Sequence, residues 1–237
     1  MRKLGIFLIF LSLFSCKYWQ FQGVGQEYHQ VSEATEDTLI FTIIQPYKHK
    51  LDSVMQVVIA NLDYDLRKSR PSGTLGNWMA DACVRQAERI SGSSVDLGLF
   101  NYGGIRRPFL NKGPVTLGMM YELMPFENQL VLLKIEGRWL QEALNWACKK
   151  GGEPLSGLKL NVTTRVATLN NGREIHGDSI YHLITNDFML EGGDGYTMLT
   201  KAASVERLGL LRDALVYDMM HHPLVMELLE ERRVINE

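Results

Sequence analysis

The sequence predicts a single mixed domain of the α+β class. Helical and strand-like apolar patterns alternate along the chain, but without the regular spacing of repeated βαβ units. The pair Asn171-Gly172 lies between two strand-like runs and is typical of a turn between antiparallel strands. A chain of 237 residues with 46% hydrophobic content can bury one substantial core.

The first residues are predicted to direct export and to lie outside the fold. Arg2 and Lys3 precede a nearly continuous apolar run over residues 4–14, which is too short to span a bilayer as a helix. Residues 13–16, Leu-Phe-Ser-Cys, which overlap the end of this run, resemble the lipobox of bacterial lipoproteins. Residues 1–15 are therefore expected to be a signal peptide, with Cys16 lipidated; an ordinary cleaved signal peptide is the alternative.

The region after this leader is predicted to tether the domain to a membrane. Residues 16–37 are polar and show little periodicity, so the domain is expected to cover residues 38–237. The predicted location is the bacterial cell envelope, periplasm or outer membrane, with the lipid on Cys16 as the membrane anchor. Cys83 and Cys148 lie in helical patterns beside apolar neighbours and are expected to be buried free thiols, although a bridge between them is possible.

The first third of the domain is predicted to contain one strand and two helices. Residues 39–44 form a short apolar run typical of a strand. Over residues 51–59, apolar side chains recur at the spacing of an amphipathic helix, and residues 74–90 repeat that pattern.

The middle third alternates strands and helices. A buried-type strand over residues 95–100 stops at Asn101-Tyr102-Gly103-Gly104, where the chain must turn. A short helix over residues 117–124 ends before a proline. A strand over residues 129–135 and a helix over residues 138–149 follow.

The last third is predicted to begin with a hairpin. Strands within residues 158–169 and 179–185 flank the turn Asn170-Asn171-Gly172-Arg173. Helices are expected over residues 205–220 and 223–232.

The stretch from Asn186 to Tyr196, NDFMLEGGDGY, combines features of a turn and of a binding site. Glycines surround Asp194, and Phe188 precedes it by six residues. Glycine permits positive φ and close approach of a ligand, which explains a tight loop. A turn alone does not require the aspartate, because Asn or Ser would serve as well. Both interpretations stay open from this stretch alone.

Five segments together resemble a known family in their order along the chain. They are LGNWMADA (75–82), NYGGIR (101–106), MPFEN (124–128), LKIEG (133–137) and TNDFMLEGGDGY (185–196). They are similar to the C-terminal domain of the bacterial 5'-nucleotidases, the UDP-sugar hydrolase family, over about residues 38–222. The resemblance implies the α+β fold of that domain.

The resemblance also implies a nucleoside site. In that family two aromatic rings enclose the base, and the matching residues here are Phe126 and Phe188. A lone phenylalanine is more often a core residue, but two at matching positions favour base binding. Asp194 would accept hydrogen bonds from the ribose hydroxyls, with Gly193 among the glycines that leave room for the sugar.

Phosphate recognition is implied for a different set of residues. Arg106 would face the phosphate, with Asn101 nearby, because a guanidinium pairs with phosphate through a planar fork. The family commonly has phosphate-facing arginines before its LGN segment. Arg67 and Arg70 both precede that segment here, and the sequence does not distinguish between them.

No catalytic residue and no metal ligand is predicted in this chain. Full-length relatives place a metallophosphatase domain with two metal ions before this domain, where the present sequence has the tether. The chain has no Asp-x-His pair, no Asn-His-Asp or Asn-His-Glu step and no His-x-His pair, and its six histidines lack dinuclear spacing. Divalent metals are therefore expected only on a partner metallophosphatase.

These observations support three hypotheses for function. The first is the nucleotide-binding half of a split 5'-nucleotidase, completed by a separately encoded metallophosphatase chain. The second is a lipoprotein that binds nucleosides or nucleotides without hydrolysis, and the third is a scaffold with a vestigial pocket. A nucleic-acid polymer is not expected as a partner, because the net charge of -2 leaves no basic stripe.

Overall fold

The computed structural model describes residues 38–222 and residue 224. It divides the chain into two compact units, residues 1–44 and 45–237. The predictions for the signal peptide, Cys16 and the tether fall outside the described residues. Within the described part, no helix is both long and apolar enough to cross a membrane.

The first described element is a helix where a strand was expected. Helix α2 spans Thr38–Met55, includes Pro46 and has no buried residue. The strand predicted over residues 39–44 is therefore wrong, and the helix predicted over residues 51–59 ends at Met55. A short apolar run does not by itself distinguish strand from helix, and a helix satisfies its backbone groups without a neighbouring strand. From Val58 the chain is instead a strand, β1.

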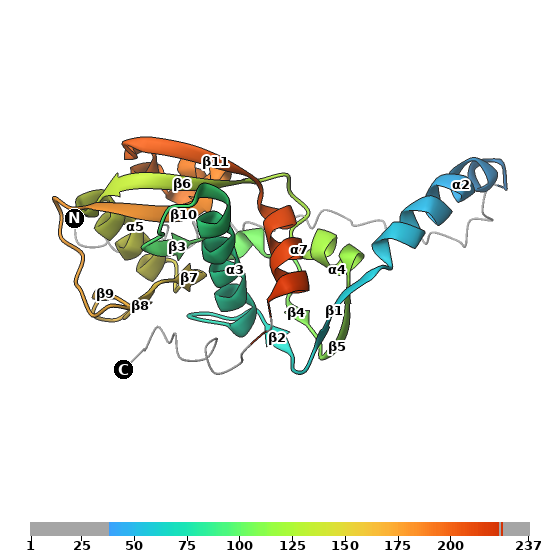
Figure 1. Ribbon diagram of the computed structural model, residues 1–237, viewed down its shortest axis with the longest axis horizontal. Coiled ribbons are helices and arrows are strands. Elements are labelled where there is room, and N and C mark those ends of the chain that lie inside the picture. Colours follow the sequence, from blue (N-terminus) through green and yellow to red (C-terminus); the bar gives the residue numbers. More distant parts are fainter. Residues whose placement is uncertain (1–37, 223, 225–237) are drawn as a thin grey trace, which may run out of the picture. The chain divides into compact units, whose positions relative to one another are not determined.

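A five-stranded mixed sheet forms the centre of the second unit, in the order β11-β6-β10-β3-β7 (Figure 1). Its strands are β3 (Leu97–Leu99), β6 (Gln129–Glu136), β7 (Leu155–Ser156), β10 (Ile180–Asn186) and β11 (Ser204–Leu210). Strands β3 and β10 are parallel, and the other neighbouring pairs are antiparallel. The mixed topology agrees with the predicted α+β class.

Alternating side chains of β6 separate two cores on opposite faces of the sheet. Leu130 and Leu132 join one buried cluster, whereas Val131, Leu133 and Ile135 join the other. The first cluster includes residues of α3 (Thr74–Ser91) and α7 (Leu211–His221), and the second includes residues of α5 (Gly137–Lys149). The helices predicted over residues 74–90 and 138–149 are confirmed, as are the strands at 95–100 and 129–135.

Smaller elements surround this sheet. They are β1 (Val58–Leu62) paired with β5 (Gly113–Thr116), β2 (Leu66–Arg67) paired with β4 (Phe109–Leu110), β8 (Leu158–Leu160) paired with β9 (Ala167–Leu169), α4 (Leu117–Leu123), α6 (Asp187–Leu190), and the 3-10 turns η1 (Tyr102–Gly104), η2 (Gly193–Gly195) and η3 (Thr197–Lys201). Helix α4 confirms the helix predicted over residues 117–124.

The turn of the predicted hairpin forms, but the strand after it pairs with other strands than predicted. Gly172 adopts φ +80° and donates its N–H to Leu169 O at 2.8 Å, so the chain turns where the Asn-Gly pair predicts. However, β9 pairs with β8, and β10 runs between β6 and β3. Leu183 and Ile184 are buried on opposite faces, and this two-sided burial makes β10 a central strand of the sheet.

The helix predicted over residues 205–220 is correct only in its second half. Residues Ser204–Leu210 form β11, an edge strand on β6, and α7 begins at Leu211. Gly209, near the end of β11, adopts φ +100°, which lies outside helical geometry and prevents the helix from starting earlier. The helix predicted over residues 223–232 falls outside the described residues apart from Leu224.

Candidate functional site

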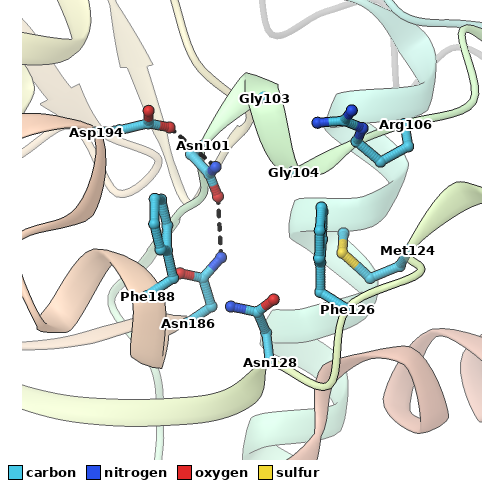
Figure 2. A pocket seen from close by; sticks show the side chains of 10 residues that line it. All are labelled: Asn101, Gly103, Gly104, Arg106, Met124, Phe126, Asn128, Asn186, Phe188 and Asp194. Carbon is cyan, nitrogen blue, oxygen red and sulfur yellow. Dashed lines mark hydrogen bonds between the residues drawn. The ribbon is translucent and has the colours of Figure 1, made fainter.

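Three asparagines meet at one edge of the central sheet. Asn101 follows β3, Asn186 ends β10, and Asn128 immediately precedes β6. Because β10 is parallel to β3 and antiparallel to β6, these positions come together. Asn186 Nδ2 donates to Asn101 Oδ1 at 3.0 Å, and Asn101 Nδ2 donates to Asp194 Oδ2 at 3.0 Å (Figure 2).

A pocket of about 230 Å³ opens beside these hydrogen bonds. Its lining is formed by Asn101, Gly103, Gly104, Arg106, Met124, Phe126, Asn128, Asn186, Phe188 and Asp194. Figure 2 shows the rings of Phe126 and Phe188 on opposite walls, with their faces turned toward each other across an open gap. Each of these side chains is 43% exposed, so neither is a core residue. The Asn128 carboxamide lies at the floor of the gap.

The position of Phe188 is fixed by the short helix α6. Asn186 caps this helix, since its Oδ1 accepts a hydrogen bond from Met189 N at 2.9 Å. Behind the ring lies Gly193, where a Cβ atom would stand 2.6 Å from ring carbons of Phe188. Gly193 does not line the pocket. Its missing side chain leaves room for the Phe188 carbonyl oxygen, 2.5 Å from a Cβ placed there, and for the Phe188 ring, rather than for the sugar that the sequence suggests.

Asp194 is held from several sides and stays accessible. Its backbone has φ +55°, a left-handed conformation that is uncommon for a residue other than glycine. Trp146 Nε1 donates to the Asp194 carbonyl at 2.9 Å, and Lys150 Nζ lies 3.5 Å from Asp194 Oδ1. Because the side chain is 34% exposed, its carboxylate can still accept hydrogen bonds from a ligand in the pocket.

The positively charged Arg106 lies on the side of the pocket opposite Asp194, and Lys68 lies near it. The Arg106 guanidinium lies 5.6 Å from the Phe126 ring centroid, and Figure 2 shows it on the Phe126 side, with Asp194 on the Phe188 side. Lys68 Nζ donates to Ile105 O at 2.7 Å. Burial, together with the neighbouring arginines, lowers the pKa of Lys68.

The structure separates the two arginines that the sequence leaves equivalent. The Arg70 guanidinium carbon lies 4.4 Å from the ring centroid of Tyr102, and Tyr102 immediately precedes the pocket residue Gly103. Arg67 instead pairs with Asp65 at 2.7 Å, and its side chain is 65% exposed. Arg70 therefore belongs to the positive cluster beside the pocket, and Arg67 does not.

The sequence predicted five of the ten residues that line this pocket and missed the other five. The predicted residues Asn101, Arg106, Phe126, Phe188 and Asp194 all line it. The missed lining residues are Gly103, Gly104, Met124, Asn128 and Asn186. All of them lie within the segments quoted above, and the polar ones stand at the ends of predicted strands, which is the signal that could have identified them.

The described residues do not fit a catalytic metal centre. No group of three or more His, Cys, Asp or Glu side chains that could hold a metal ion occurs among them. His182 Nδ1 is engaged with Ser94 O at 2.8 Å. Cys83 and Cys148 are free and buried as predicted, and burial raises the pKa of both thiols.

Comparison with known proteins identifies the family. Residues 54–201 match the family described as "5'-nucleotidase, C-terminal domain". The chain belongs to this family. The 5'-nucleotidase precursor of Thermus thermophilus has a similar solved structure, with a TM-score of 0.67 and 26% identity over 79% of this chain and 41% of that one. The predicted resemblance and fold class are thereby confirmed.

Two curated relatives show the breadth of this 5'-nucleotidase C-terminal family. The trifunctional nucleotide phosphoesterase protein YfkN of Bacillus subtilis is 28% identical over 189 residues, which are 70% of this chain and 13% of that protein. The cell wall protein Lmo0130 of Listeria monocytogenes is 27% identical over 202 residues, 73% of this chain and 26% of that protein. The chain thus spans less than half the length of these relatives.

Proposed function

We propose that this domain binds the nucleoside part of a nucleotide and presents its phosphate to a metallophosphatase domain on a separate chain. The observation that carries the proposal is the pair of half-exposed phenyl rings, Phe126 and Phe188, facing each other across a pocket. A planar heterocyclic base fits such a gap, because both of its faces can stack on an aromatic ring.

The polar groups around the gap suit the rest of a nucleoside. The Asp194 carboxylate, held by Asn101, offers acceptor oxygens for two vicinal ribose hydroxyls. The Asn128 carboxamide at the floor offers a donor and an acceptor for the edge of a base. Asn128 Nδ2 already donates to Asp187 Oδ1 at 3.1 Å, which fixes the orientation of its amide.

The opposite charges on the two sides of the pocket determine the orientation of a bound nucleotide. A phosphate would be repelled by Asp194 and attracted by Arg106 on the opposite side of the pocket. Arg70 and Lys68 extend this positive region, since both lie against the ring of Tyr102, at 4.4 and 3.9 Å. We therefore assign phosphate attraction to Arg106 and Arg70. Arg70 lies over the Tyr102 ring beside the pocket, although its Nη2 is also 3.9 Å from Glu153 Oε2, whereas the exposed Arg67 side chain pairs with Asp65.

Hydrolysis is assigned to the separate metallophosphatase chain and not to the described residues of this one. That part offers no donor cluster for a dinuclear metal centre. The direct test mixes this protein with a candidate metallophosphatase chain and a divalent metal, and measures phosphate release from AMP and UDP-glucose. Release only when both chains are present supports a split 5'-nucleotidase, and full activity from this chain alone would contradict it.

Capture of nucleotides without hydrolysis is the second candidate. Calorimetric titration with adenosine, AMP and UDP-glucose distinguishes it: micromolar binding, with no partner recovered in pull-downs, favours capture over the split enzyme. If Phe188→Ala and Asp194→Asn change no measurable binding or activity, the vestigial scaffold is favoured instead.

Attachment to the cell envelope completes the proposal. It rests on the lipobox-like sequence ending at Cys16 and on a relative named as a cell wall protein. Replacing Cys16 with alanine should release the exported chain from the membrane fraction, and unchanged membrane association would contradict a lipid anchor at this residue.

A further inference from the structure

A buried carboxyl group lies directly behind the pocket, in the loop between α5 and β7. The side chain of Glu153 is 0% exposed. One of its oxygens, Oε2, accepts a hydrogen bond from the backbone N–H of Tyr102, the first residue of turn η1. The other oxygen, Oε1, has no hydrogen-bond partner among the described residues. Glu153 therefore anchors the turn that carries Asn101 and Gly103.

Lys150 connects this buried carboxylate to the pocket. Its Nζ lies 3.5 Å from Glu153 Oε1 and 3.5 Å from Asp194 Oδ1, and it donates to the Asp194 carbonyl at 3.3 Å. Asp194 in turn accepts the hydrogen bond from Asn101, whose neighbour Tyr102 returns to Glu153. These contacts form a closed ring, and its members Asp194 and Asn101 line the pocket.

Stability does not account for a carboxylate at this position. A buried ion pair recovers its desolvation penalty only when its geometry and hydrogen bonding are complete. Here Glu153 Oε1 lies 3.5 Å from Lys150 Nζ without a well-formed hydrogen bond, next to the buried hydroxyl of Tyr196. Burial raises the pKa of Glu153, so the loss of solvent disfavours its charged form.

We propose that Glu153 and Lys150 are positioning residues for nucleoside binding, which orient the Asp194 carboxylate and the Asn101 turn toward the ligand. The inference rests on the proposed function of the pocket. Neither residue lines the pocket, so both act through Asp194 and Asn101. An oriented charged acceptor loses less freedom on binding than a mobile one, which is the physical advantage of the ring.

The ring makes nucleoside affinity depend on pH. The titratable or charged groups that face Glu153 are Lys150, Arg70, Lys68, Tyr196 and Asp194. When Glu153 takes up a proton, Lys150 loses one of its two carboxylate partners and the ring opens. Affinity for adenosine is therefore expected to fall as pH decreases through the raised pKa of Glu153.

Protonation of Glu153 affects folding stability with the opposite sign: it weakens nucleoside binding but stabilises the folded state. Because the pKa of Glu153 is raised in the folded state, its contribution to stability is fully present below the ordinary glutamate pKa and is lost as pH rises through the raised value. Glu153→Gln keeps an acceptor for the Tyr102 N–H and removes the charge, so it should not lower the melting temperature at neutral pH. Binding and stability thus change in different directions.

The test compares Glu153→Gln, Lys150→Met and the double variant by calorimetry with adenosine, from about pH 4, near the ordinary glutamate pKa, to about pH 8. Each single variant should weaken binding by roughly tenfold at neutral pH, and the double variant by little more, because coupled residues are not additive. Glu153→Gln should also flatten the pH profile. The control Asp218→Asn alters a buried carboxylate that pairs with Arg85 at 2.6 Å, away from the pocket, and should lower stability and leave affinity unchanged.

Failure of this inference differs from failure of the proposed function. If the wild-type protein binds adenosine and Glu153→Gln binds with the same affinity and pH profile, the positioning role is overturned. If the wild-type protein binds no nucleoside, the proposed function fails instead. In ligand-free protein, the NMR signals of the Asn101 carboxamide and the Trp146 indole should shift in Glu153→Gln and in Lys150→Met, and unchanged signals would overturn the ring by themselves.

Discussion

Removing one ring of the aromatic pair isolates the interaction on which the proposed function depends. Phe188→Ala deletes a side chain that is 43% exposed, so little of the protein's stability depends on it. Stacking of a base on an aromatic side chain contributes roughly 1 to 3 kcal/mol, so the variant should bind adenosine about 5- to 140-fold more weakly. The opposite ring, Phe126, keeps its own stacking face, which limits the loss to one ring.

Calorimetric titration with adenosine at a fixed salt concentration measures this loss. Phe109→Ala is the matched control, since Phe109 is 37% exposed on β4 and does not line the pocket. It should retain wild-type affinity. An affinity of Phe188→Ala within about twofold of wild type would refute base stacking at this position, because it is smaller than the weakest expected effect.

Three further substitutions test other parts of the site. Asp194→Asn tolerates the left-handed backbone and removes the charge, so it should weaken adenosine roughly tenfold or more and leave 2',3'-dideoxyadenosine unchanged; equal losses for both ligands would contradict ribose recognition. Gly193→Ala would place a Cβ 2.5 Å from the Phe188 carbonyl oxygen and 2.6 Å from its ring. Both adenosine affinity and melting temperature should fall, with a loss of roughly 1 to 3 kcal/mol in the free energy of unfolding. A wild-type melting curve would show that both the Phe188 backbone and its ring shift without cost. Arg106→Gln should weaken AMP roughly tenfold in calorimetry without changing adenosine, because only AMP carries a phosphate. Equal affinities of the variant and the wild type for AMP would remove Arg106 from phosphate binding.

The fold could be predicted where one face of an element is buried and the apolar period is unbroken. The apolar patterns were sufficient for α3 and α5. Helix α5 buries one stripe, and α3 keeps a helical apolar period although its first half is buried on all sides. The partners of each strand could not be predicted from the local sequence. The Asn171-Gly172 turn forms, but the strand after it pairs with β6 and β3, and that choice depends on two-sided burial of Leu183 and Ile184.

The pocket residues could be predicted from sequence motifs, but the contacts that hold them in place could not. Phe126, Phe188 and Asp194 stand in segments that resemble the family, and the structure brings them into one pocket. Glu153 gave no such signal, because a single glutamate in a glycine-rich loop is ordinary in sequence. Its burial, and the ring that it closes with Lys150, arise only from tertiary contacts.

The central claim is that a nucleoside base binds between Phe126 and Phe188, and intermolecular NOE contacts test it most directly. In the complex with adenosine, the adenine H2 and H8 protons should show NOE contacts to ring protons of both phenylalanines, since both rings face the same gap. Contacts to neither ring, or contacts only to residues outside this pocket, would contradict the account.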